Sequence, residues 1–307
     1  MKHIPSVTVA LILFFFAAQV IGLLVVNEYI DHRATAEAHE VVYKPLPYNL
    51  ERPEVQNQST SFIWILASIL LGTGILLLIV KTKKTFFWKI MFFISVATTL
   101  SVALASFMNN LLAGILAIAI AAWRLYRPNM IIHNISEVFI YGGLAAIFVP
   151  MLNVFAAFML LIGISIYDYI AVYRTKHMVK LAKFQSESKV FAGLLIPYER
   201  NKTAKEYKKM PVNSRSTANK QAASKKSAAV LGGGDIGFTL IFAGVVMKEL
   251  MLQETFLVGF MKALIIPLIV SLALLFLLVK GRKDKFYPAM PILSLGCFIG
   301  YLVVWLI

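Results

Sequence analysis

The sequence predicts an all-helical protein that crosses a membrane nine times. Of its 307 residues, 59% are hydrophobic and only 15% are charged, and the mean hydropathy is +0.77. These values are typical of integral membrane proteins. Nine apolar runs approach or exceed the length of about 20 residues that a helix needs to cross a bilayer. The charges between the runs alternate along the chain, which assigns each loop to one side of the membrane.

The nine runs cover residues 6–26, 60–80, 86–107, 109–126, 131–149, 151–173, 230–247, 255–279 and 286–307. The hinges FMNN and VPMLN between neighbouring runs are short, so eight spans remain an alternative. The apolar part of the first run exceeds the roughly 7 to 15 residues of a signal peptide core, and we interpret it as a helix. We expect residues 1–150 to form a scaffold of five helices and residues 151–307 to carry the candidate chemistry on four.

Lys and Arg collect in every second loop. Segment 27–59 holds six acidic and three basic residues, whereas KTKK at 81–84, Arg124 with Arg127, and KGRKDK at 280–285 are basic. Because short basic loops stay in the cytoplasm, the pattern predicts a cytoplasmic N-terminus and a C-terminus outside. The expected location is an integral multi-pass protein, in the cell membrane if the chain is prokaryotic.

The longest polar segment, 174–229, carries fourteen Lys and Arg against three Glu and is expected in the cytoplasm. Topology and attraction to anionic headgroups explain this charge better than nucleic-acid binding. Within it, MVKLAK predicts a short surface helix, and KVFAGLLIPY at 189–198 predicts a strand or a re-entrant piece. The stretch 201–229 has few large apolar residues and is predicted to be a mobile linker.

Three acidic residues lie inside apolar runs, where an ionised side chain costs at least about 2.5 kcal/mol. They are Glu137, Asp168 and Asp235. Asp168 is five residues, roughly 8 Å, from the cytoplasmic end of the sixth run, and Asp235 enters the seventh at a similar depth. Two carboxylates at one level on consecutive antiparallel helices are placed to face each other. Glu137 is interpreted as a structural residue, paired with a basic neighbour.

A facing pair of carboxylates in a dry site holds a single proton, because both cannot be ionised at once. The ionised carboxylate can take a proton from water while the protonated one polarises a carbonyl oxygen. A pair of carboxylates that acts in this way is suited to the hydrolysis of peptide bonds. From spacing alone an alternative stays open, in which Asp235 caps its helix and Asp168 reaches the interface near Arg174 and Lys176.

The sequence predicts neither a metal nor another cofactor. The five histidines show no spacing typical of metal ligands, and the glycines at 232–234 precede no Lys-Ser or Lys-Thr pair. The lone Cys297 lies in the last run and is interpreted as a packing residue.

Three short motifs resemble the signatures of the presenilin and signal peptide peptidase family of intramembrane aspartyl proteases. They are SIYDYIAVY around Asp168, Gly-x-Gly-Asp ending at Asp235, and PAMP at 288–291. They occur in this order on the sixth, seventh and ninth predicted helices, with a basic loop between the first two. The resemblance is strong over 151–307 and rests on helix number before that.

The resemblance implies a nine-helix protein in the presenilin orientation, with Asp168 and Asp235 as the catalytic pair. It also implies supporting roles around the pair for a further set of residues, which are Tyr167, Gly232, Gly234, Pro288, Ala289, Met290 and Pro291. Met290 stands where the family has Leu, a swap of similar volume. Gly233 replaces the commoner Leu of Gly-x-Gly-Asp, which leaves substrate preference open. The segment after the sixth helix resembles the one that lends a strand to bound substrate in presenilin. The two prolines have a simpler alternative, which is that they only start the last helix.

The expected partners are the lipid bilayer and the transmembrane helix of a substrate protein or a remnant signal peptide. No nucleic acid is expected, and the sequence leaves obligatory subunits undetermined. Three rival interpretations are a proton-coupled transporter that uses the same acids, a prepilin-type peptidase, and a non-catalytic scaffold. Both acids lie near one membrane face, and the halves show no repeat, which argues against the transporter.

Overall fold

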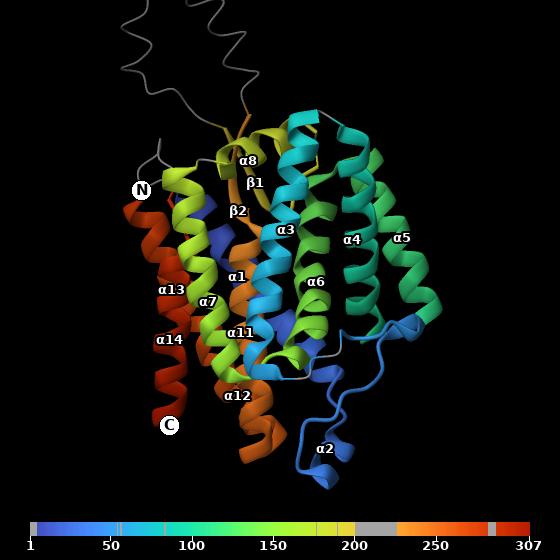
Figure 1. Cartoon of the computed structure of the whole chain (residues 1–307), viewed down its shortest axis with the longest axis vertical. Coiled ribbons are helices and arrows are strands. Elements are labelled where there is room, and N and C mark those ends of the chain that lie inside the picture. Colours follow the sequence, from blue (N-terminus) through green and yellow to red (C-terminus); the bar gives the residue numbers. More distant parts are fainter. Residues whose placement is uncertain are drawn as a thin grey trace, which may run out of the picture.

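A computed structural model describes residues 5–53, 55, 57–82, 84–175, 177–188, 190–199, 226–281 and 287–307. Nearly all of it is helical (Figure 1). The helices are α1 (Pro5–Glu28), α2 (His32–Ala38), α3 (Ser61–Thr82), α4 (Thr85–Ala105), α5 (Asn110–Tyr126), α6 (Met130–Phe148), α7 (Val154–Tyr169), α8 (His177–Glu187), α11 (Gly233–Gln253), α12 (Phe256–Ala263), α13 (Ile265–Lys280) and α14 (Met290–Leu306). Short 3-10 turns lie at Pro47–Asn49, Gln58–Thr60 and Val149–Met151, and a π-helical turn at Ile170–Arg174 follows α7.

Every predicted apolar run lies largely in helix. Six helices of the described chain are long and apolar enough to cross a membrane, and the apolar helices α5 and α14 are shorter. These spans make the chain an integral, multi-pass membrane protein; nine crossings and the orientation of the termini remain predictions. The run at 255–279 coincides with the candidate span Phe256–Lys280, within which Leu264 separates α12 from α13. The run at 286–307 was predicted to start too early, because its helix begins only at Met290.

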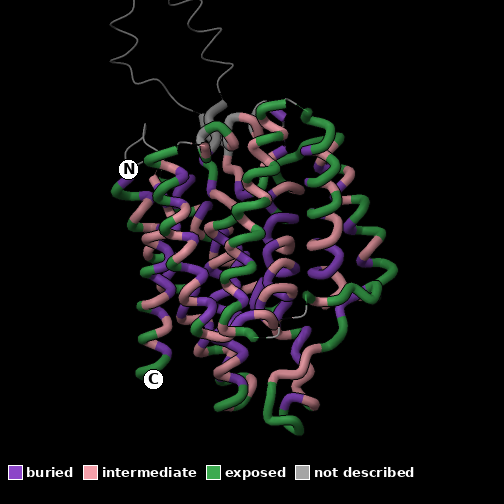
Figure 2. Tube along the Cα trace, in the orientation of Figure 1, coloured by how far each residue is buried: buried purple, intermediate pink, exposed green. Residues whose placement is uncertain are grey.

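The helix α11 lies at the centre of the bundle, in contact with α1, α6, α7, α13 and α14. All residues from Thr239 to Lys248 are buried, so this stretch has protein on every side. By contrast, α3 buries only Ser61 and Ile65, because it packs mainly on α7. Figure 2 shows the same division, with the buried positions concentrated inside the bundle. The helix that begins with the Gly-x-Gly-Asp motif, α11, is therefore held in place by neighbouring helices on all sides.

A two-stranded antiparallel sheet lies at one end of the bundle, beside α8 and opposite α2 (Figure 1). It consists of β1 (Gly193–Glu199) and β2 (Lys226–Gly232), with Gly193 paired to Gly232 and Glu199 to Lys226. The segment 189–198, which was predicted to be a strand or a re-entrant piece, thus contributes a strand from Gly193 onward; Lys189 lies outside the described residues. The start of the predicted span at 230–247 was wrong, because Val230 and Leu231 belong to β2. The predicted linker 201–229 also ended too late, since β2 begins at Lys226; residues 201–225 lie outside the described part.

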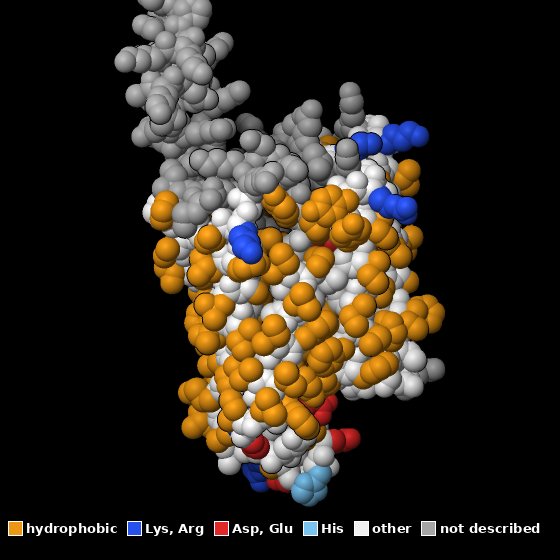
Figure 3. All heavy atoms as spheres, turned by 90° about the vertical axis from the view of Figure 1, so that its left-hand side faces the viewer, with side chains coloured by type: hydrophobic (Ala, Val, Ile, Leu, Met, Phe, Trp, Pro, Cys, Tyr) orange, Lys and Arg blue, Asp and Glu red, His pale blue; other side chains and the backbone are white. Residues whose placement is uncertain are grey.

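The lipid-facing character of the surface is visible in Figure 3, where hydrophobic side chains cover most of the bundle's height. Exposed Leu272 and Phe276 of α13 and Leu295 and Ile299 of α14 belong to this surface. Such a continuous apolar surface is far larger than a water-soluble monomer exposes. Most of the acidic side chains visible in this view lie at the end away from the sheet.

Candidate active site

Asp168 is held in the last turn of α7, close to the end of the bundle that carries the sheet. Its residue is only 5% exposed, and its Oδ2 accepts a hydrogen bond of 3.1 Å from the backbone N–H of Met290. The N–H of Ala289 also lies close to this carboxylate. A buried carboxylate needs such donors, because burial without partners costs several kcal/mol. The alternative in which Asp168 extends to the interface is not what the structure shows; Lys176, which that alternative named, lies outside the described residues.

The motif PAMP provides these donors because it stands where α14 begins. Residues 287–289 precede the helix, Ala289 is its N-cap, and Pro291 lies in its first turn. The first N–H groups of a helix have no partner inside the helix and favour negative charge, so they bind the Asp168 carboxylate. Pro291 suits the first turn, where its missing N–H costs nothing. A hydrogen bond of 2.8 Å between Ser165 and Ser294 also joins α7 to α14.

Asp235 lies in the first turn of α11, two residues after the helix begins at Gly233. It is therefore not the N-cap residue, which is Gly232. Its carboxylate turns back to the backbone N–H of Gly232, as the acidic residue of a capping box does. The charges of Asp235 and Asp168 act on each other. The two acids are thus brought together from helices that meet side by side, α7 and α11.

The three glycines before Asp235 differ in what surrounds them. A Cβ on Gly233 would lie 2.7 Å from the hydroxyl of Tyr141, which is too close. A Cβ on Gly232 would lie 3.2 Å from Oδ2 of Asp235. Gly234 is exposed, and its nearest neighbour would be the ring of Phe238 at 3.5 Å. Close packing therefore requires glycine most strongly at 233. The sequence alone did not indicate that this position has the strictest steric requirement of the three.

Tyr167 points away from the neighbouring acid, toward α3 and α8. Its hydroxyl lies 3.0 Å from Oγ1 of Thr73 and 3.0 Å from Nε2 of His177. Burial lowers the pKa of His177, so its imidazole is neutral at pH 7 and offers one donor and one acceptor nitrogen. Tyr167 thus links three helices next to the site.

Gln19 of α1 contacts the start of α11 and was missed by the sequence analysis. Its Nε2 donates to the carbonyl oxygen of Ile236 at 3.0 Å and lies 2.8 Å from Oγ1 of Thr239, which itself donates to the carbonyl of Asp235 at 2.8 Å. Gln19 is 1% exposed. An amide in the middle of an apolar run is the signal that could have found it, since such a group needs a partner in lipid.

Glu137 is structural, as predicted, and its basic partner is Arg124. The two side chains are each 2% exposed and 2.5 Å apart, and Tyr141 donates its hydroxyl to the other carboxylate oxygen. Arg124 also donates to Ser136 at 3.1 Å. Removing one partner from a buried ion pair costs roughly 3–5 kcal/mol, so this group rigidly joins α5 to α6.

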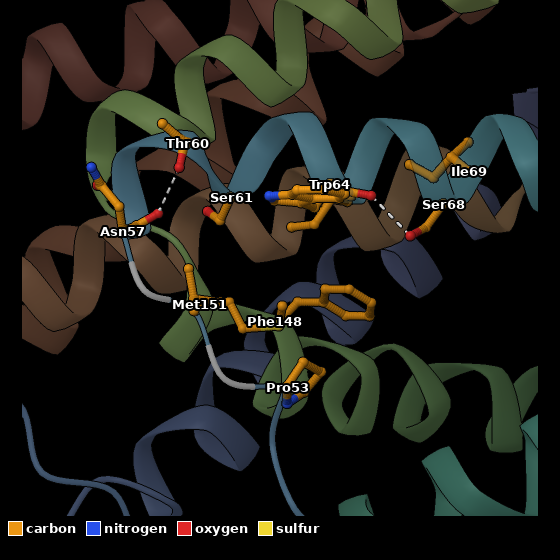
Figure 4. A pocket seen from close by; sticks show the side chains of 11 residues that line it. Pro53, Asn57, Thr60, Ser61, Trp64, Ser68, Ile69, Phe148 and Met151 are labelled. Carbon is orange, nitrogen blue, oxygen red and sulfur yellow. Dashed lines mark hydrogen bonds between the residues drawn. The ribbon is translucent and has the colours of Figure 1, made fainter.

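A cavity of about 780 Å³ lies away from the two acids (Figure 4). It is lined by the segment before α3, the first turns of α3 and the end of α6, with Trp64, Phe148 and Met151 around it. Trp64 is nine residues, about 14 Å along α3, from the Thr73 that contacts Tyr167. Among the residues that the structure describes, no ionisable side chain lines it, so we do not assign chemistry to it. Within the described ranges, no group of three His, Cys, Asp or Glu is placed to hold a metal.

Fold and site together define a multi-pass membrane protein whose two carboxylates approach each other near one end of a helical bundle. Residues 42–307 match the family model described as signal-peptide peptidase, presenilin aspartyl protease, and the chain belongs to this family. Comparison with curated protein sequences gave no significant match.

Two solved structures share the fold. One, described as a presenilin family intramembrane aspartate protease in space group C222, has a TM-score of 0.59 and 19% identity, over 97% of this chain and 98% of that one. The other, with the same description but in space group P2, has a TM-score of 0.58 and 19% identity, over 100% of this chain and 99% of that one.

Proposed function

We propose that this protein hydrolyses peptide bonds within transmembrane segments or remnant signal peptides, with Asp168 and Asp235 as the catalytic pair. Membership of the aspartyl protease family supports the class of reaction. The observation that carries the assignment of residues is the junction of all three motifs. Asp168 bonds to the start of α14 in PAMP, and its charge acts on Asp235 of Gly-x-Gly-Asp.

The proposed chemistry needs only water and the two carboxyl groups. The ionised carboxylate takes a proton from water, whose oxygen attacks the carbonyl carbon, while the protonated carboxyl donates its proton to the carbonyl oxygen. The resulting gem-diol collapses when the C–N bond breaks. The leaving nitrogen receives the proton of the protonated carboxyl, and one hydroxyl proton of the gem-diol passes to the ionised carboxylate, so that the pair again holds a single proton. The non-helical backbone at 287–289 supports this scheme, because irregular backbone at membrane depth is tolerated where it borders a water-filled cavity.

A substrate helix has to reach the pair from the lipid, and α3 offers the easiest route. It is the long helix with the fewest buried residues, and beside α7 it stands near Asp168. The cavity at Trp64 lies further along the same helix, where the distant part of a substrate helix would pass. We propose that substrate enters along α3.

The unwound part of the substrate is proposed to pair with the sheet. The pairing of β1 with β2 directs the backbone groups of Ala228, Val230 and Gly232 away from β1, because groups two residues apart share one edge. This edge leads directly into Asp235. A strand added there would carry its peptide bonds past the catalytic pair.

The experiment compares two activities of the purified protein in liposomes. Cleavage of a tagged single-span reporter is followed on gels, and proton flux is followed with an enclosed pH-sensitive dye. We expect reporter fragments and no flux above that of empty liposomes. Flux without cleavage across several reporters would favour the transporter, and neither activity would favour the scaffold.

A further inference from the structure

The edge of β1 that faces away from β2 is occupied by side chains of α5 and α6. Arg124 Nη2 donates to the carbonyl of Phe191 at 3.4 Å, His133 Nε2 to that of Gly193 at 2.7 Å, and Asn134 Nδ2 to that of Leu195 at 2.8 Å. These carbonyls are two residues apart, which is the repeat with which a strand presents groups to one side. The helices therefore fill the place of a neighbouring strand.

Asn134 makes the most complete of these contacts. Besides its donation to Leu195, its Oδ1 accepts the N–H of the same residue at 2.9 Å. One side-chain amide thus satisfies both backbone groups of one strand residue, as a backbone amide in a sheet would. Asn134 is only 6% exposed, so water does not readily replace it. The next residue on this edge, Pro197, has no N–H to offer.

The same helix also contacts the segment before Asp235. Glu137, one turn after His133, bonds to Tyr141, whose hydroxyl touches Gly233. The Nδ1 of His133 accepts from Arg124 at 3.0 Å, which leaves Nε2 as the donor to Gly193. Gly193 has a φ of +141°, which a side chain would strain, so β1 starts at a defined point. Thus α6 contacts both β1 and the start of α11.

We propose that Asn134 is a positioning residue for the cleavage reaction, which fixes the register of β1, and through β2 the register of an added substrate strand, relative to Asp235. This inference rests on the proposed function. A slip of two residues between β1 and α6 keeps the strand faces unchanged but moves the strand by about 7 Å. Such a slip would present a different peptide bond to the catalytic pair.

The test is mass spectrometry of the reporter fragments from wild type, Asn134→Leu, Asn134→Asp and the control Asn129→Leu. Leu is similar in size to Asn but makes neither bond, and Asp keeps only the acceptor. Asn129 lies before the same helix, and its side chain caps Ile131 at 2.9 Å. The control therefore weakens α6 without removing a bond to β1.

We expect wild type and Asn129→Leu to cut at the same positions. Asn134→Leu should distribute cleavage over additional positions and lower kcat/KM about tenfold, with Asn134→Asp in between. If folded Asn134→Leu cuts where wild type does, in the same proportions, the inference is wrong. If Asn134→Leu does not fold, Asn134→Asp decides by the same criterion. If wild type cleaves no reporter, the proposed function is wrong, and this inference is wrong with it.

Discussion

At the scale of single residues, Tyr141 lies so near Gly233 that no side chain fits at this glycine. Gly233→Ala would place a Cβ 2.7 Å from the Tyr141 hydroxyl, and we expect kcat/KM to fall by about tenfold or more as the start of α11 shifts. Adding Tyr141→Phe removes the hydroxyl and should restore part of the activity. The cycle of single and double variants measures this coupling. Strictly additive losses would contradict the proposed contact.

Gln19 allows a residue-scale prediction on stability. Gln19→Leu removes its bonds to Ile236 and Thr239, and we expect a loss of about 1–2 kcal/mol in the free energy of unfolding in detergent. Gln58→Leu is the matched control, because its amide makes one exposed bond to Pro150. Equal effects of the two substitutions would show that Gln19 does not support α11.

Single residues also show which parts of the site the sequence could predict. Asp168 and Asp235 were found because an acid in an apolar run is costly and rare. Gln19, His133 and Asn134 were missed, since neutral polar residues are a weaker signal and their partners are backbone groups far along the chain. The direction in which the Tyr167 side chain points could not be predicted either, because it depends on Thr73 in another helix.

At the scale of elements, the junction of α3 with α7 decides whether a substrate helix enters as proposed. The side chain of Leu66 lies against Gly163 of α7. We expect the double variant Leu66→Cys, Gly163→Cys to form a disulfide on oxidation and to lose most cleavage of a single-span reporter. Reduction should restore activity, and each single variant serves as control. Full activity of the cross-linked protein would place the entrance elsewhere.

Helical elements were easier to predict than their ends. Apolar length alone located the helices, whereas the strand at Val230 and Leu231 continues the apolar run into α11 without a visible break. The break between α12 and α13 was missed for the same reason. The apolar composition of β1 predicted a strand. The sequence around Lys226 is polar and gave no sign of β2, because the pairing of two strands far apart in the chain cannot be read from local composition.

At the scale of the whole molecule, the charge pattern predicts the side on which the sheet lies. Single cysteines at Lys202 and Lys44, introduced after Cys297→Ser, should react oppositely with a membrane-impermeant maleimide on intact cells. We expect labelling at 44, which lies in the loop after α2, and none at 202 until the cells are opened. Labelling at 202 on intact cells would reverse the proposed orientation.

The most direct measurement compares reporter cleavage by wild type, Asp168→Asn, Asp235→Asn and Asp31→Asn, each purified and shown to be folded. Asp31 caps α2 at the end of the bundle away from the sheet, and Asn caps about as well, so this control should cut normally. We predict at least about a thousandfold loss in each of the other two variants, because neither carboxyl alone can act as both acid and base. Cleavage that persists in either variant would show that Asp168 and Asp235 are not the catalytic pair.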